Sequence, residues 1–127
     1  MSSVPEEITM DEYGHFVKTS SFYAHAGKRD EKELCYLSLG LGGEAGETVD
    51  VVKKIVRDSH NDRDFRVNYN QRVDSIADEA GDVLWYLQGL CNFLGITIEE
   101  LAQKNAYKLC SRHKQLWKSS GLTAASR

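Results

Sequence analysis

Proline occurs once in the 127-residue chain, at position 5, and this near absence of helix breakers is what most restricts the fold. A proline inside a helix removes a backbone donor and clashes with the preceding turn, so its absence leaves long helices available. No β-rich run competes with them. The sequence therefore predicts an all-α chain, and its length predicts a single domain over residues 1–127.

Helix starts are predicted from the capping box, in which a side-chain oxygen accepts a hydrogen bond from a free backbone N–H. Three pairs fit this pattern: Thr9 and Glu12, Asp30 and Glu33, and Thr97 and Glu100. The helices that they begin are expected to run through about residues 26, 58 and 114. A loop is expected at 59–70, where the sequence is polar. Another helix is expected from about residue 71 to residue 94, with Gly95 ending it.

These elements predict a four-helix, bundle-like fold with two long central helices. The core is expected at about residues 9–115, with a flexible tail at 116–127.

The net charge of −3 argues against binding to a nucleic-acid polymer, which usually needs a basic face. No apolar run is long enough to span a membrane. The N-terminus lacks a signal peptide, and the three cysteines are widely spaced, so we expect a cytoplasmic protein with reduced thiols.

Two short motifs, "EAGE" at 44–47 and "EAGD" at 79–82, each place two acids one helical turn apart. On the helical wheel, Glu44 and Glu47 follow the margin of one apolar stripe, and Glu79 and Asp82 follow the same margin of another. The first stripe consists of Leu34, Leu37, Leu41, Ala45, Val52 and Val56. The second consists of Ile76, Ala80, Val83, Leu87, Leu90 and Leu94.

Four carboxylates beside a core repel one another, which raises their pKa values, and a divalent cation removes this penalty. The simpler alternative is that the acids face solvent, where the repulsion costs little. Ligands that are all oxygen favour Mg²⁺, with Mn²⁺ as a substitute, and Mg²⁺ usually binds substrate phosphates as well. No histidine follows either acid pair at the spacing of a di-iron bundle, which argues against a di-metal oxidase.

Glycine inside a helix costs about 1 kcal/mol relative to alanine, so Gly46 and Gly81 within the motifs need an explanation. We favour the close approach of another helix or subunit, with local plasticity beside the site as the alternative.

Trp85 lies opposite the second apolar stripe, and we expect it to be exposed at an interface. Four other aromatic residues can form either a base pocket or ordinary core: Phe16, Phe22, Tyr23 and Tyr36.

Asn105, Lys108 and Arg112 share one face of the last predicted helix. They can bind a triphosphate, with Arg as a forked donor and Lys as a point charge. The equal alternative is that the two cations complement the negative end of the helix dipole. Lys54 stands two turns beyond Glu47 on nearly the same side and can join this phosphate-binding set.

Three segments together resemble the MazG-like nucleotide pyrophosphohydrolases of phages and bacteria. They are "YLSLGLGGEAGETVDVVKKIVRD", "IADEAGDVLWYLQGL" and "NAYKLCSRH". The acid pairs match the Glu-x-x-Glu and Glu-x-x-Asp signature of that family, and the similarity extends over about residues 10–113. Two features depart from it: the connection between the acid pairs is longer than in compact members, and a Gly-Ser-Gly-Asp stretch is missing from the tail.

The resemblance implies Mg²⁺-dependent hydrolysis of a nucleoside triphosphate to the monophosphate and pyrophosphate by a homodimer or homotetramer. Glu44, Glu47, Glu79 and Asp82 are implied to bind the metal. Our hypothesis for the mechanism is that one carboxylate, Glu47 or else Glu44, activates the attacking water. Phosphate contacts are implied for Asn105, Lys108 and Arg112. The expected location is the cytoplasm, that of the host if a phage encodes the chain. The alternative is a non-catalytic helical adaptor that retains the fold.

Overall fold

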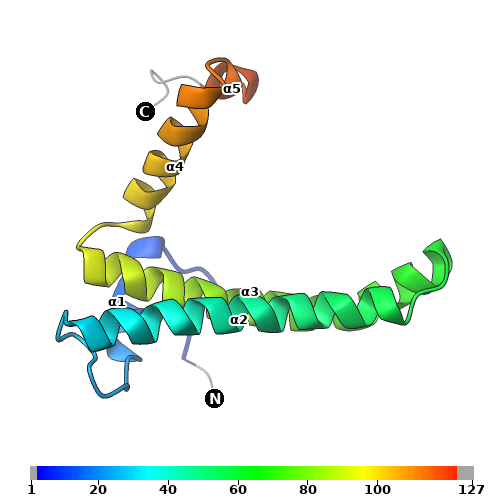
Figure 1. The fold of residues 1–127 in the computed structure, drawn as a ribbon, viewed down its shortest axis with the longest axis horizontal. Helices are drawn as coiled ribbons and strands as arrows, with labels where there is room; N and C mark the ends of the chain where they lie inside the picture. The colour runs from blue at the N-terminus through cyan, green and yellow to red at the C-terminus, as the bar shows by residue number, and fades with distance from the viewer. Residues whose placement is uncertain (1–2, 123–127) are drawn as a thin grey trace.

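The computed structural model describes residues 3–122, and helices are the only regular secondary structure in that range. They are α1 (Met10–Thr19), α2 (Glu31–Arg57), α3 (Asp62–Leu94), α4 (Ile98–Arg112) and α5 (Leu116–Ser119). Helices α2 and α3 form a long antiparallel hairpin, α1 packs on α3, and α4 projects from one end of the hairpin (Figure 1). The predicted all-α class and the two long central helices are confirmed, although α4 does not close a bundle within the chain.

The three predicted helix starts are confirmed by hydrogen bonds. At α1 the capping box is complete: the Thr9 hydroxyl accepts from the backbone N–H of Glu12 at 3.1 Å, and the Glu12 carboxylate accepts from the N–H of Thr9 at 3.1 Å. The caps of α2 and α4 make only the first of these two bonds, with Asp30 and Thr97 as the acceptors. Gly95 ends α3 in the left-handed conformation, as predicted.

Two predicted boundaries are wrong. Helix α1 ends at Thr19 rather than near residue 26, and the hydroxyls of Ser20 and Ser21 donate to backbone carbonyls of its last turn, those of Phe16 and Val17. Helix α3 begins at Asp62 rather than near residue 71. The Asn61 side chain caps it by accepting from the N–H of Asp64 at 2.9 Å, and acidic residues in the first turn suit the positive end of the helix dipole. Residues 62–70, predicted as loop, are therefore helical.

Within the predicted tail at 116–127, Leu116–Ser119 form the short helix α5, which has no buried residue. Residues 123–127 of that tail lie outside the described residues. None of the described helices is both long and apolar enough to cross a membrane.

The face of α2 that meets α3 is rotated by about one residue from the predicted stripe. Buried or half-buried positions on α2 fall at 33, 37, 40, 41, 44, 48, 50, 51, 54 and 55, and most of them share one helical face. Gly40 and Gly89 allow this register, because a Cβ at either position would clash with Tyr86 or Leu37 respectively. Four members of the predicted stripe are exposed as a result: Ala45, Leu34 at 40%, Val52 at 42% and Val56 at 61%.

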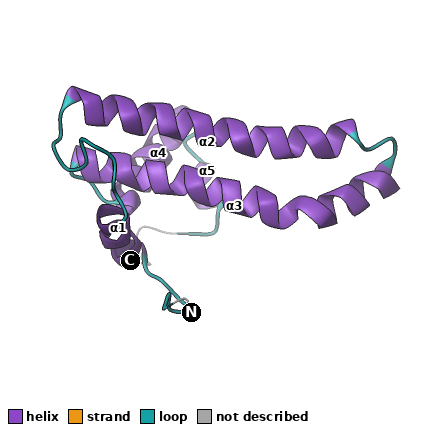
Figure 2. Cartoon of the chain, turned by 90° about the horizontal axis from the view of Figure 1, so that it is seen from below, coloured by secondary structure: helices purple, strands orange, loops and turns teal. Residues whose placement is uncertain are grey.

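Helix α1 lies beside α3 (Figure 2). Polar contacts attach α1 and the segment after it to α3. The Asn92 side chain donates to the backbone carbonyl of Gly14 at 3.3 Å, and the Trp85 indole donates to the Ser20 hydroxyl at 2.9 Å. Apolar burial is small: within residues 3–122 the only buried hydrophobic side chains are those of Val17, Leu37, Ile55 and Cys91.

Candidate metal centre

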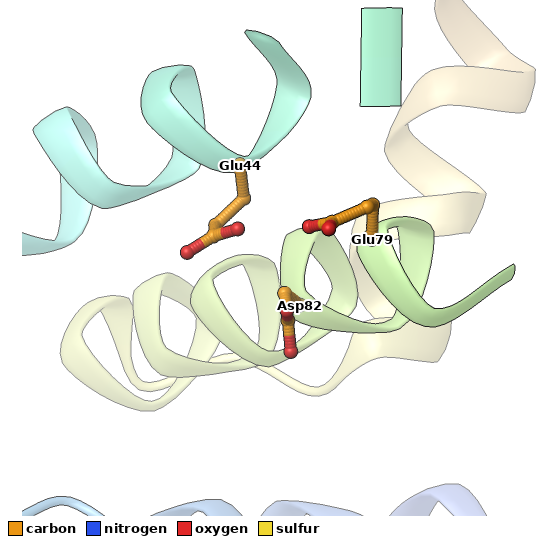
Figure 3. Close-up of side chains that lie close together, drawn as sticks. All are labelled: Glu44, Glu79 and Asp82. Carbon is orange, nitrogen blue, oxygen red and sulfur yellow. The ribbon is translucent and has the colours of Figure 1, made fainter. Parts of the chain in front are cut away.

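Three carboxylates from the two arms of the hairpin come together near its middle (Figure 3). Glu44 comes from α2, and Glu79 and Asp82 come from successive turns of α3. One carboxylate oxygen from each of the three lies within 4.8 Å of the other two. Glu44 lies on the face of α2 that meets α3, rather than at its margin, so this acid is half-buried between the helices. We refer to Glu44, Glu79 and Asp82 as the acid cluster.

The electrostatics of the acid cluster are unfavourable without a cation. The pKa of Glu79 is raised, first by its partial removal from water and then by the negative charges of Asp82, Glu47 and Glu44. Hard oxygen donors that converge from two elements and repel one another have the chemistry that a divalent cation requires. Because all three candidate ligands are carboxylate oxygens, the donor set fits Mg²⁺.

Glu47 lies one turn after Glu44 and is exposed. Its carboxylate is outside the acid cluster but close enough to raise the pKa of Glu79. Of the four acids that the sequence predicts as metal ligands, the structure thus brings three together and places the fourth beside them.

A cleft of about 310 Å³ opens beside the acid cluster and is lined by Glu44, Asp82, Trp85 and Tyr86. The two aromatic residues follow Asp82 by three and four positions, so they stand one turn further along the same side of α3. Their rings meet edge to face with centroids 5.0 Å apart. The sequence analysis did not assign Trp85 and Tyr86 to this site, although their spacing from Asp82 indicates such a position.

The expectation that Trp85 is exposed at an interface is wrong. Its side chain is partly buried, and besides its bond to Ser20 it lies edge-on to Tyr23, with ring centroids 6.3 Å apart. Tyr23 in turn stacks on Tyr36 with centroids 4.3 Å apart. Two of the four other candidate aromatics therefore border the cleft residues, whereas Phe22 is 90% exposed.

Tyr86 connects the aromatic residues to the acid cluster. Its hydroxyl donates to that of Tyr36 at 3.4 Å. This hydrogen bond, burial and the nearby charges of Glu44 and Asp82 raise the pKa of Tyr86 to about 12. The hydroxyl of Tyr86 is therefore protonated at neutral pH and remains a hydrogen-bond donor.

The segment that carries Tyr23 is held by the buried carboxylate of Glu33, which is only 3% exposed. Glu33 accepts hydrogen bonds from the Tyr23 hydroxyl at 2.8 Å and from the backbone N–H groups of Gly27 at 2.6 Å and Arg29 at 3.0 Å. Burial alone would raise the pKa of Glu33, but these bonds outweigh it and lower the pKa. Glu33 thus fixes the aromatic side of the cleft.

The predicted phosphate-binding residues are not at the acid cluster within one chain. Asn105, Lys108 and Arg112 are exposed on α4, and across residues 3–122 no hydrogen bond or ion pair joins a side chain of α4 to α2 or α3. Lys54 is bound to Asp50 at 2.8 Å. The bonds from Lys54 and Lys53 lower the pKa of Asp50 to about 2.

The glycines within the two acidic motifs do not adjoin another helix of the chain. A Cβ placed at Gly46 or Gly81 would have no described atom within 4 Å apart from the local helix backbone. Close approach by another helix of the same chain is therefore excluded for them among the described residues. Gly40 and Gly89 have that role instead.

The geometry defines a class: an all-α protein whose helical hairpin carries an acid pair on each arm and brings three of these four acids together in one cluster. Residues 34–117 match the model of the MazG nucleotide pyrophosphohydrolase domain, and the chain belongs to this family. The chain is also similar to the "Gene 37 protein" of Mycobacterium phage L5, with 38% identity over 104 residues. That alignment covers 81% of this chain and 87% of the phage protein. No solved structure matches significantly.

Proposed function

We propose that the chain is a Mg²⁺-dependent nucleoside triphosphate pyrophosphohydrolase that converts a (d)NTP and water into a (d)NMP and pyrophosphate. The acid cluster is the observation that carries this proposal, because it joins three oxygen donors from two helices within 4.8 Å. Membership of the MazG nucleotide pyrophosphohydrolase family supports the same reaction. The donor set suits Mg²⁺, with Mn²⁺ as a substitute.

In the proposed mechanism, Glu44, Glu79 and Asp82 would hold the metal, and the carboxylate of Glu47 would stand beside it. Bound Mg²⁺ supplies polarisation of phosphate oxygens and a lowered pKa for a bound water. Glu47, exposed beside the cluster, accepts the proton of the attacking water, with Glu44 as the alternative base. The water oxygen bonds to the α-phosphorus, the bond from that phosphorus to the α,β-bridging oxygen breaks, and pyrophosphate leaves with the electron pair.

The cleft provides a place for the rest of the nucleotide. Trp85 and Tyr86 line it together with two of the acids, so a base stacked on an aromatic ring has its phosphates directed to the metal centre. Asn105, Lys108, Arg112 and Lys54 are the proposed phosphate donors. Such donors stabilise the charge that develops on the leaving pyrophosphate. The substrate pool is expected to be cytoplasmic.

A non-catalytic helical adaptor is the second candidate. The observation that favours it is the row of partly exposed apolar side chains on α2, which a protein partner can cover. The adaptor has no use for a cluster of mutually repelling acids, so the first proposal accounts for more of the structure.

The two candidates are separated by a hydrolysis screen. Each NTP and dNTP is incubated with the protein, Mg²⁺ and inorganic pyrophosphatase, and phosphate is measured with malachite green. We expect phosphate release with at least one nucleotide. Because the coupling pyrophosphatase itself requires Mg²⁺, formation of the (d)NMP is followed directly when EDTA replaces Mg²⁺, and it is expected to stop. Glu79→Gln is expected to abolish release, while Asp74→Asn, which removes an exposed acid elsewhere on α3, retains it. Absence of release from every nucleotide would overturn the hydrolase proposal and support the adaptor.

A further inference from the structure

Residues 20–30 join α1 to α2, and we call them the connecting segment. They lie at the end of the hairpin where α2 begins, near the last turns of α3 (Figure 2). One end of the segment is bonded to α3, since the Ser20 hydroxyl accepts from the indole of Trp85. The other end is bonded to α2, since the backbone N–H groups of Gly27 and Arg29 donate to Glu33. The connecting segment is therefore tied to both arms of the hairpin.

Tyr23 is the residue of the connecting segment that reaches the aromatic residues at the cleft. Its ring stacks on Tyr36 with the two planes 20° apart, and it meets the ring of Trp85 at an angle of 79°. Trp85 lines the cleft, whereas Tyr23 is not among its lining residues. Tyr23 is thus placed to act on a bound nucleotide through the rings that it contacts rather than by direct contact.

The polar groups of Tyr23 and Trp85 are already engaged within the protein. The Tyr23 hydroxyl donates to the carboxylate of Glu33 at 2.8 Å, and the Trp85 indole N–H donates to the Ser20 hydroxyl at 2.9 Å. Ser20 is itself held, because its hydroxyl donates to the backbone carbonyl of Phe16 at 2.9 Å. An indole has a single donor and no acceptor, so the part of Trp85 that is left for a nucleotide is its ring.

The bond between Tyr23 and Glu33 is the strong contact in this arrangement. A hydrogen bond to an ionised acceptor is roughly twice as strong as one between neutral groups. Glu33 is only 3% exposed, so water has little access to compete for its oxygens. Because Glu33 belongs to α2, the bond ties the Tyr23 ring to the helix that also carries Glu44 of the acid cluster. The ring that flanks Trp85 is therefore held in a defined position relative to the candidate metal centre.

We propose that Tyr23, anchored by Glu33, is a positioning residue for the nucleoside: it holds the Trp85 ring in the orientation that stacks on the base and does not itself touch the substrate. The inference rests on the proposed function for the identity of the bound group, a nucleotide. The acids of the cluster keep their places when Tyr23 is released. Loss of the bond to Glu33 should therefore weaken binding of the nucleoside and spare binding of the phosphates.

The first test follows Trp85 directly and needs no ligand. The chain has two tryptophans, so Trp117→Phe leaves Trp85 as the only one. In this background Tyr23→Phe is expected to increase the quenching of Trp85 fluorescence by acrylamide, because the flanking ring loses its anchor but keeps its size. Tyr69→Phe is the matched control and should leave quenching unchanged, since Tyr69 is 41% exposed and lies sixteen residues before Trp85, about 24 Å along α3. Equal quenching in the two variants would overturn the proposal.

The second test is a double-mutant cycle, measured by calorimetry with nucleoside monophosphates and with Mg²⁺-pyrophosphate. For the monophosphate that the wild type binds most tightly, Tyr23→Phe is expected to lower the affinity about 5-fold, the lower end of what one aromatic stack on a base contributes. The affinity for Mg²⁺-pyrophosphate should be unchanged. In a Trp85→Leu background, Tyr23→Phe should cause no further loss, because the ring that it positions is absent. An additive loss in the double variant, or an equal loss for pyrophosphate, would refute the positioning role.

The two tests separate this inference from the proposed function. A wild-type chain that binds no ribonucleoside or deoxyribonucleoside monophosphate would refute the proposed nucleotide site, while the quenching measurement would still decide whether Tyr23 positions Trp85. A wild type that hydrolyses a nucleotide, together with a Tyr23→Phe variant of wild-type quenching and wild-type affinity for the monophosphate, would refute the positioning role alone.

Discussion

The ring of Tyr86 on α3 occupies the space that a Cβ at Gly40 on α2 would need. The glycine therefore determines how closely the arms of the hairpin approach at the cleft. Tyr86 also touches Tyr36 and Trp85, so the ring has little freedom to move aside. A small change at position 40 should thus be transmitted directly to the cleft.

We predict that Gly40→Ala lowers the free energy of unfolding by about 1–3 kcal/mol, the usual cost of overfilling a packed site. The same substitution at Gly46, which has open space beside it, should raise stability by about 0.5–1 kcal/mol through helix propensity. Urea unfolding of the two variants measures both effects. In a Tyr86→Ala background the penalty at position 40 should disappear, and its persistence there would show that Tyr86 is not its cause.

The acid cluster predicts a stability effect whose sign depends on the metal. In EDTA, Glu79→Gln should melt at a higher temperature than the wild type, because it removes one of the mutually repelling charges. In Mg²⁺ the order should reverse, since only the wild type gains stability by binding the ion. Thermal melts with both additives test this, with Asp74→Asn as the control. A Mg²⁺-induced rise in Tm that is equal in all three proteins would contradict the site.

Glu33 predicts how stability depends on pH. Its folded-state pKa lies below the ordinary value of 4.5, so its ionised form stabilises the fold fully above that pH, and the contribution is lost as pH falls through the lowered pKa. Glu33→Gln should cost about 2–3 kcal/mol at pH 7, the scale of a lost hydrogen bond to a charged group. The gap from the wild type should narrow below about pH 4.5. Glu31→Gln, on the exposed first turn of α2, should show no such narrowing in urea titrations at several pH values.

Trp85 predicts a separation of base binding from phosphate binding. Trp85→Leu should lower the affinity for the product nucleoside monophosphate by about 10-fold, consistent with 1–3 kcal/mol for an aromatic stack on a base. Affinity for Mg²⁺-pyrophosphate should be unchanged, because no phosphate-binding role falls to Trp85. Calorimetry with the two ligands measures both. An equal loss of affinity for both ligands would indicate a general disturbance of the cleft rather than the loss of a base contact.

The sequence predicted the all-α class, the starts of three helices and the acids of the cluster, because each depends on local spacing. Capping boxes act within four residues, and acids three apart necessarily share one side of a helix. The helical start of α3 was missed because its polar composition resembles a loop, whereas a single Asn61 cap and the packing of the opposite arm stabilise it.

The register between α2 and α3 could also not be predicted from the sequence. Hydrophobicity placed Leu34 and Val52 at the centre of the contact face, but Gly40 and Gly89 permit a closer approach on the neighbouring face. Glu44 moves between the helices as a result, and the most apolar side of α2 is left open. The direction of α4 depends on the left-handed turn at Gly95 and on whatever packs beside α4, and the second of these is not encoded locally.

The hairpin has a consequence for how such a chain tolerates insertions and deletions. The long stretch between the acid pairs is almost entirely helix, with only residues 58–61 between the arms. One residue inserted between Asp62 and Asp78 would turn Glu79 by about 100° relative to α2 and dismantle the cluster. Removal of seven residues from each arm would restore the phase after two turns and leave the acids opposite one another. What matters along this stretch is therefore helical phase, and arm length is free to vary in whole pairs of turns.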